Sequence, residues 1–235
     1  MKTIDLSSST VLVTGANRGL GRHFAEQLVA RGAKVYAGAR KPESVDIPGA
    51  IPLQLDITDP VSVAAAAATA NDVTVVINNA GISTGASLLT GDLADIRAEF
   101  GTHLFGTLDV TRAFVPVLEA NGGGALLNVL SVLSWISFPT AGAYCAAKSA
   151  EWSMTNALRA ELAERDIRVS ALHVGYMDTD MTAGIEAAKS SPADVATLAL
   201  DQLAAGAPEI LADELSHQVQ AGLAGGVAAL YPALA

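Results

Sequence analysis

Short runs rich in β-branched residues alternate along this chain with longer stretches in which apolar residues recur every three or four positions. Runs of the first kind predict buried strands, and the periodic stretches predict helices. The predicted strands cover residues 10–14, 33–39, 51–55, 73–77, 125–130, 167–173 and, at a sheet edge, 208–211. The predicted helices cover residues 20–30, 61–70, 92–120, 144–164 and 191–206.

This alternation predicts an α/β fold of the Rossmann type, in which helices cover both faces of a doubly wound parallel sheet. The run from Val73 to Ile77 is β-branched throughout, as expected of a strand that is buried on both faces. The chain has 235 residues and shows no linker, repeat or charge block. We therefore interpret residues 1–235 as a single domain.

The helix predicted at 92–120 carries an apolar stripe that we expect to face the core. The stripe consists of Ile96, Phe100, Leu104, Leu108, Val115 and Leu118. His103 falls on or beside it. The Ala- and Gly-rich residues 221–230 predict no particular element, and we interpret them as either a subunit contact or a loose tail.

Composition and charge exclude several classes of protein. Half of the residues are hydrophobic, which is enough for a sizeable core. The formal net charge is −10 and no Lys/Arg cluster interrupts it, so we expect neither nucleic acid nor a membrane surface as a partner. Cys145 is the single cysteine, so we predict no internal disulfide and no metal site. Without a secretion signal or an apolar run near ~20 residues, we expect a cytoplasmic protein.

A glycine-rich turn joins the first predicted strand to the first predicted helix. It runs from Thr14 to Gly21 and reads Thr-Gly-Ala-Asn-Arg-Gly-Leu-Gly. Glycines at such a turn let backbone N–H groups approach a pyrophosphate at the positive end of the helix. No Gly-Lys-Ser/Thr closes the turn, so it is not a nucleotide-triphosphate loop. Dinucleotide binding is the better interpretation, and ordinary turn glycines are the alternative.

The second predicted strand ends at Ala39 and is followed by Arg40. In this architecture an acid near that point binds the 2′-hydroxyl of NAD, whereas an arginine accepts the 2′-phosphate of NADP. Between the end of this strand and Glu43 no acid occurs, and Arg18 inside the glycine turn offers a second cation. We therefore predict NADP as the cofactor, with two solvated surface arginines as the alternative.

A serine, a tyrosine and a lysine lie on either side of the segment between the strand predicted at 125–130 and the helix predicted at 144–164. Ser131 follows the strand at 125–130, and Tyr144 and Lys148 fall four residues apart on a predicted helix, so they share one face. A neighbouring ammonium lowers the pKa of a phenol from its usual value of about 10 and makes it a usable general acid or base. Chance spacing on an amphipathic helix is the alternative for the motif taken alone.

Together these motifs resemble those of the classical short-chain dehydrogenase/reductase family. The resemblance rests on Thr14-Gly-x-x-x-Gly-x-Gly21, Asp56, Asn78-Asn-Ala-Gly81, Ser131 and Tyr144-x-x-x-Lys148, with Ser131 thirteen residues before Tyr144. It covers residues from about 9 to 213. It implies hydride transfer between a nicotinamide and a carbonyl/alcohol pair.

The resemblance also implies roles for individual residues. Tyr144 is implied as general acid in reduction and base in oxidation, Lys148 as the group that lowers its pKa and binds the nicotinamide ribose, and Ser131 as a hydrogen-bond partner of the substrate oxygen. Cofactor contacts are implied at Gly15, Asn17, Arg18, Gly19, Leu20, Gly21, Arg40, Asp56, Ile57, Asn78, Asn79, Ala80, Gly81, Tyr144, Lys148, Gly175 and Thr179. Substrate-pocket walls are implied at Leu133, Trp135, Tyr176 and Met177, although core residues would have the same composition.

Two positions depart from the family pattern. The family usually carries an asparagine, three residues before a glycine, that supports a water relay to the lysine; here His103 occupies that place before Gly106. His103 is either a substitute in the relay and a fourth catalytic residue or a packed helix histidine. The family's Pro-Gly after the sixth strand is Val174-Gly175 here.

We therefore expect an NADPH-dependent reductase of a hydrophobic ketone or aldehyde, acting reversibly as an alcohol dehydrogenase and assembled as a homodimer or homotetramer. The alternatives are a non-catalytic NADP-binding sensor or regulator and an NAD-dependent alcohol dehydrogenase of the same family.

Overall fold

The structure is a computed structural model, and it describes residues 3–231. A seven-stranded sheet forms its centre, in the order β3-β2-β1-β4-β5-β6-β7, and every pair of neighbouring strands is parallel. The strands are β1 Thr10–Thr14, β2 Lys34–Ala39, β3 Ile51–Gln54, β4 Val75–Asn78, β5 Gly124–Val129, β6 Ile167–His173 and β7 Glu209–Leu211. The predicted doubly wound Rossmann-type fold is confirmed.

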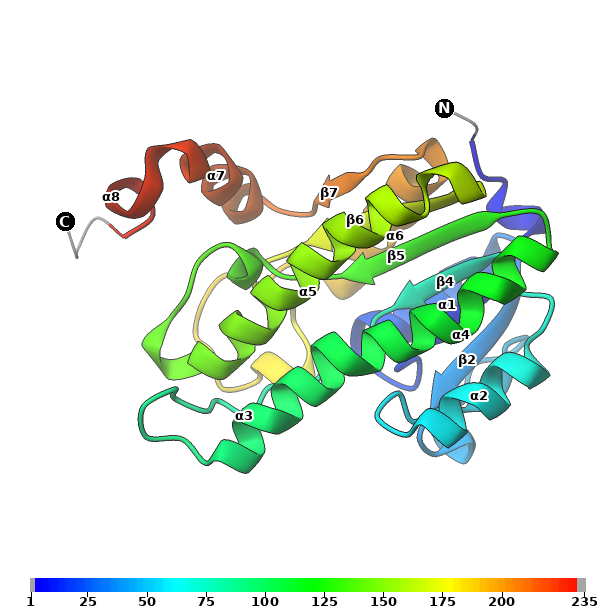
Figure 1. Cartoon of the computed structure of the whole chain (residues 1–235), viewed down its shortest axis with the longest axis horizontal. Helices are drawn as coiled ribbons and strands as arrows, with labels where there is room; N and C mark the ends of the chain where they lie inside the picture. The colour runs from blue at the N-terminus through cyan, green and yellow to red at the C-terminus, as the bar shows by residue number, and fades with distance from the viewer. Residues whose placement is uncertain (1–2, 232–235) are drawn as a thin grey trace.

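Helices cover both faces of the sheet, as Figure 1 shows. They are α1 Gly19–Ala30, α2 Pro60–Thr69, α3 Leu93–Phe100, α4 Thr107–Ala120, α5 Gly142–Glu161, α6 Pro192–Ala205, α7 Glu214–Gly222 and α8 Gly226–Leu230. In β1, Val11 and Val13 pack into the core beneath α1 and α6, whereas Leu12 packs into the core beneath α2, α4 and α5. This two-sided burial explains the unbroken apolar runs of the strands.

Local sequence explains several element ends. Ser191 caps α6 by accepting a hydrogen bond from the Asp194 amide, and Pro192 occupies the first turn. Gly206 ends α6 with a φ of 80°. The boundaries expected from these residues are correct to within one position.

The helix predicted at 92–120 is wrong in its continuity and in its buried face. A π-helical segment, Gly101–Gly106, separates α3 from α4. The wider turn rotates the helix face, so the expected apolar residues are half-buried and polar residues are buried instead. The half-buried ones are Ile96, Phe100, Leu104 and Leu108; the buried polar ones are Glu99, Thr102, His103 and Thr107. Val115 and Leu118 are buried as predicted.

The C-terminal segment, whose sequence predicted no element, forms α7 and α8. Leu230 and Tyr231 pack against a small cluster that contains Leu133 and Ile136, and the Tyr231 hydroxyl accepts a hydrogen bond of 2.8 Å from the Ser137 amide. Residues 221–230 are therefore attached to the loop that follows β5. They are not a loose tail.

Among residues 3–231, no helix is both long enough and apolar enough to cross a membrane.

Candidate active site

The glycine turn between β1 and α1 leaves an open helix N-terminus at the carboxyl edge of the sheet. A Cβ at Gly21 would lie 2.3 Å from the Gly15 carbonyl oxygen and 2.4 Å from Asn79 Nδ2, so only glycine fits there. Arg18 precedes α1, and its side chain caps none of the first N–H groups. These groups remain available to an anion, which fits the pyrophosphate of a dinucleotide. Asn17 and Leu20 lie in the same turn.

Arg40 and Asp56 lie side by side because they follow neighbouring strands. The Leu55 amide donates a 2.9 Å hydrogen bond to the Ala39 carbonyl, which aligns the ends of β2 and β3. Burial acts to raise the pKa of Asp56, but hydrogen bonds from Thr58 and the nearby Arg40 outweigh it, and the net pKa is lowered. Arg40 is exposed at this strand end, and its binding of a 2′-phosphate stays a prediction.

Arg18 has a protein partner across the groove. It forms an ion pair of 3.6 Å with Asp180, and both side chains are exposed. Thr179, which precedes Asp180, lies against Gly19, with 3.6 Å between its Cγ2 and the position of a Cβ on that glycine. The segment after β6 is thus close to the glycine turn. Joint binding of a phosphate by Arg18 and Arg40 stays a prediction.

The Asn78-Asn-Ala-Gly81 turn is held mainly by contacts within the protein. Asn79 donates 2.9 Å to the Thr14 carbonyl, and the Thr14 hydroxyl accepts from the Asn79 and Ala80 amides, both at 2.9 Å. The buried Asn78 donates 2.9 Å to Asn128 Oδ1. These bonds fix the ends of β1, β4 and β5 relative to one another. Ile57 is also buried and packs against Gly106. Cofactor contacts by these residues stay predictions.

Ser131, Tyr144 and Lys148 converge at the carboxyl end of β5, as their spacing predicted. The Ser131 hydroxyl accepts from the Leu133 amide at 3.1 Å, and its hydrogen bonding to Tyr144 acts to lower the pKa of that phenol. Lys148 Nζ lies 5.9 Å from the centre of the Tyr144 ring. The two side chains therefore share one face of α5.

The net pKa of Tyr144 differs from the sequence expectation. Burial raises it most, the Lys148 ammonium acts to lower it as expected, and Glu151 acts to raise it again. The net direction is upward. For Lys148, burial acts to lower the pKa, but the charges of Glu151 and Tyr144 outweigh it and the net pKa is raised. Both groups are thus protonated near neutral pH.

The predicted pocket residues separate into two groups. Tyr176 and Met177 are half-buried on a loop that closes on itself, because the Ser190 amide donates 2.8 Å to the Tyr176 carbonyl. Leu133 and Trp135 are buried, and the Trp135 ring stacks on His173 with 3.7 Å between centroids. In this conformation Trp135 packs behind the site, and its contact with a substrate stays a prediction.

Comparison with known proteins identifies the family. The family model described as short chain dehydrogenase matches residues 9–190. This chain is a short-chain dehydrogenase. The uncharacterized oxidoreductase YbbO of Escherichia coli is 31% identical over 221 residues, which cover 88% of this chain and 80% of that protein.

Solved structures support the same assignment. A short chain dehydrogenase from Burkholderia cenocepacia in complex with NADP is 38% identical, with a TM-score of 0.94 and coverage of 98% of this chain and 99% of the other. A 3-ketoacyl-(acyl-carrier-protein) reductase from Brucella melitensis complexed with NADH is 26% identical, with a TM-score of 0.82 and coverage of 88% and 98%. This short-chain dehydrogenase is therefore an oxidoreductase of a family that binds NAD or NADP.

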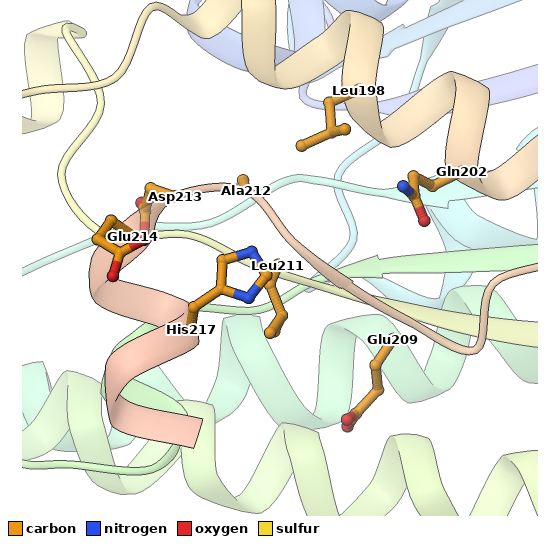
Figure 2. A pocket seen from close by; sticks show the side chains of 8 residues that line it. All are labelled: Leu198, Gln202, Glu209, Leu211, Ala212, Asp213, Glu214 and His217. Carbon is orange, nitrogen blue, oxygen red and sulfur yellow. The ribbon is translucent and has the colours of Figure 1, made fainter. Parts of the chain in front are cut away.

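A hollow of about 460 Å³ in the short-chain dehydrogenase is lined mostly by residues of α6, β7 and α7, and not by Tyr144. Figure 2 shows Leu198 and Gln202 on one side of it and Glu214 and His217 on the other. Its carboxylates are already engaged. Asp213 accepts 2.6 Å from the Gly175 amide, and Glu209 accepts 3.3 Å from Trp152 Nε1. The Asp213 contact attaches the start of α7 to the segment after β6 and positions Gly175, and the Glu209 contact joins β7 to α5.

Four polar residues of the short-chain dehydrogenase's site were missed by sequence reasoning: Glu99, Glu151, His173 and Asp213. Glu151 follows Lys148 by three residues and Glu99 precedes His103 by four on predicted helices, spacings that bring side chains together. These spacings were the available signals. His173 gains its partners only through the fold.

Proposed function

We propose that the protein is an NADPH-dependent oxidoreductase that reduces a ketone or aldehyde and reversibly oxidises the alcohol. The observation that carries the proposal is the convergence of Ser131, Tyr144 and Lys148 beside an uncapped helix N-terminus at one edge of the sheet. In open α/β sheets the carboxyl ends of the strands are where ligands bind.

In reduction, the hydroxyl of Tyr144 donates its proton to the substrate oxygen as negative charge develops there. Ser131 donates a hydrogen bond to the same oxygen and orients the carbonyl. Lys148 places a positive charge near the phenol and holds a ribose hydroxyl with an N–H that the protein does not use. A nicotinamide bound there would supply the hydride in reduction and accept it in oxidation. In oxidation the same groups act in reverse, with tyrosinate as the base.

The proposed preference for NADPH rests on Arg40. It is exposed at the end of β2 beside Asp56, and a guanidinium there matches a 2′-phosphate in charge and geometry. The Burkholderia relative with a complex containing NADP supports the same choice. The Brucella relative with NADH makes an NAD-dependent enzyme the alternative outcome.

The substrate that we propose is apolar. Tyr176 and Met177 supply apolar surface from the loop at residues 176–190, and Leu133 supplies it from the turn after Ser131. The loop spans only residues 176–190 before α6 begins at Pro192, and Met177 pairs with Ser190 across it, so it forms a short cover. A short cover fits a small or medium-sized ketone better than an enclosed, large one.

Tyr144→Phe tests the proposal most directly. The phenyl ring preserves packing and removes the proton donor, so turnover should fall by roughly 10²–10⁴-fold while NADPH binds with unchanged affinity. The measurement is NADPH and NADH consumption over a panel of ketones and aldehydes, together with a fluorescence titration of NADPH. Tyr176→Phe is the matched control, because Tyr176 lies outside the proposed proton transfer.

Retained turnover in the Tyr144→Phe variant contradicts the assignment of the acid. Tight NADPH binding by the wild type without reduction of any substrate in the panel would instead support a non-catalytic NADP-binding sensor.

A further inference from the structure

Four ionisable side chains are buried next to one another behind Tyr144. The exposed fractions are 0% for Glu99, 1% for His103, 2% for Glu151 and 4% for Lys148. They come from α3, the π-helical segment and α5, and α5 contributes two of them. Charged side chains are almost never this deeply buried unless they are paired, so their mutual arrangement needs an explanation.

Glu151 holds the ammonium of Lys148. Glu151 Oε2 lies 2.7 Å from Lys148 Nζ, and the same Nζ donates 2.8 Å to the Val129 carbonyl at the end of β5. Glu151 Oε1 accepts from the Thr107 hydroxyl at 3.2 Å. An ammonium has three N–H groups, so these two internal partners fix its position and leave one N–H for a ligand.

His103 lies between the two carboxylates but does not complete a relay. Its Nε2 is 2.8 Å from the Ile82 carbonyl, which can only accept, so Nε2 carries a proton. The same nitrogen is 3.3 Å from Glu99 Oε2. Among the residues that the structure describes, its Nδ1 has no hydrogen-bond partner; it is 3.9 Å from Glu151 Oε2, which is too far for a hydrogen bond.

The ring of His103 is held in place from two sides. It meets the Tyr144 ring edge to face, with centroids 5.2 Å apart. A Cβ at Gly81 would lie 2.7 Å from its Cε1, so the ring fits only because that residue is glycine. His103 is therefore fixed in the space between Glu99 and Glu151, whose own hydrogen bonds come from Thr84, Thr107 and Lys148.

The charges that face Tyr144 oppose one another. Lys148 favours the tyrosinate, and Glu151 and, more weakly, Glu99 disfavour it, while Ser131 hydrogen-bonds the phenol. The charge of Lys148 also acts to lower the pKa of His173, which lies on β6. The Glu151 carboxylate lies 2.7 Å from Nζ, so it partly offsets the field of the ammonium at the phenol.

We propose that Glu151 is a positioning residue for Lys148: its carboxylate fixes the ammonium against Val129 and partly offsets its charge, which adds to burial in keeping Tyr144 protonated for reduction. This inference rests on the proposed function, because it concerns the same proton transfer. In this arrangement His103 packs between Glu99 and Glu151 and is not a relay.

The experiment compares Glu151→Gln with the wild type by two measurements. In the first, the alkaline decline of carbonyl reduction with pH should move to lower pH by about one unit, because the uncompensated ammonium stabilises tyrosinate. In the second, NMR of tyrosine labelled at Cζ follows ionisation of Tyr144, identified by its absence in Tyr144→Phe. The second measurement requires no turnover, so it separates failure of this inference from failure of the proposed function.

Three further variants grade the effect. Glu99→Gln removes the more distant carboxylate and should shift both profiles in the same direction by a smaller amount, and it tests the inference even if Glu151→Gln does not fold. Glu161→Gln removes an exposed carboxylate from the same helix and should shift neither. Glu151→Asp retains the charge and should restore the wild-type profile. Unchanged profiles in both buried variants, or a shift to higher pH, would overturn the proposal.

Discussion

The two ends of the groove are built in different ways. At the proposed cofactor end, Arg18, Arg40 and Asp56 are at or near the surface; Arg18 pairs with Asp180 from the segment after β6, and Asp56 lies near Arg40 on the adjacent strand end. At the catalytic end, Glu99, His103, Lys148 and Glu151 are buried, and their partners come from segments up to tens of residues apart. Charge at the first end is screened by water, whereas charge at the second acts at short range in a drier environment.

The proposed recognition of the cofactor phosphate therefore uses exposed charges, whereas the proposed proton transfer takes place beside buried charges. An exposed arginine can select a phosphate without affecting the fold, since water solvates its charge when the ligand is absent. Buried charges have no such compensation, so each one shifts its neighbours and contributes to stability. We therefore expect substitutions at the catalytic end to alter stability and pH dependence, and substitutions at the cofactor end to alter only ligand choice.

The largest expected effect is on the stability of the catalytic end. Glu99→Ala removes the acceptor of two hydrogen bonds from Thr84, at 2.6 and 2.9 Å, and leaves His103 beside an empty space. Because a buried partner is lost, unfolding in urea should show a loss of about 3–5 kcal/mol. Asp201→Ala, which breaks an exposed pair with Arg31, is the control and should change stability little. Equal losses in the two variants would erase the contrast between buried and exposed charge.

The next effect is the pH dependence of stability caused by His173. Burial lowers the pKa of His173 from 6.5 to about 4. The unfolded chain therefore binds a proton that the folded chain does not, so the associated stability is complete above pH 6.5 and is lost as the pH falls towards 4. The loss should be on the order of 3 kcal/mol.

Urea unfolding at several pH values checks this expectation. His173→Asn should flatten the slope between these pH values, whereas the exposed His217→Asn should keep it. The slope is compared within each variant, so a constant loss of stability does not interfere. A slope in His173→Asn equal to that of the wild type would show that another group titrates there.

The smallest effect is expected at the cofactor end. Arg40→Ser removes the proposed partner of the 2′-phosphate, so the ratio of kcat/KM for NADPH to that for NADH should fall by about 10–100-fold. The free energy of unfolding should stay unchanged, because Arg40 is exposed. Lys41→Ser is the matched control, as it removes an exposed cation one residue further on. If both substitutions reduce the ratio equally, the selection is by general charge and not by Arg40.

Much of this protein could be predicted from local pattern. The seven strands, the glycine turn and the convergence of Ser131, Tyr144 and Lys148 follow from short-range residue spacing, and the sheet brings the strand ends to one edge. The error in the helix at 92–120 has the opposite origin. A π-helical turn at Gly101–Gly106 rotated the helix, and the polar residues that it buried, Glu99 and His103, are stable there only because Glu151, Thr84 and Ile82 arrive from elsewhere.

The sequence by itself therefore determined the family, the sheet and the position of the proposed proton donor, because each depends on repeated spacing or on a backbone turn of fixed form. The tertiary structure alone decided the electrostatics around that donor. The net charge near Tyr144 depends on which carboxylates are brought within a few ångströms of Lys148, and Coulomb interactions in a buried site change steeply with such distances. A single chain position, such as Glu151 or Glu99, does not reveal that distance until the chain has folded.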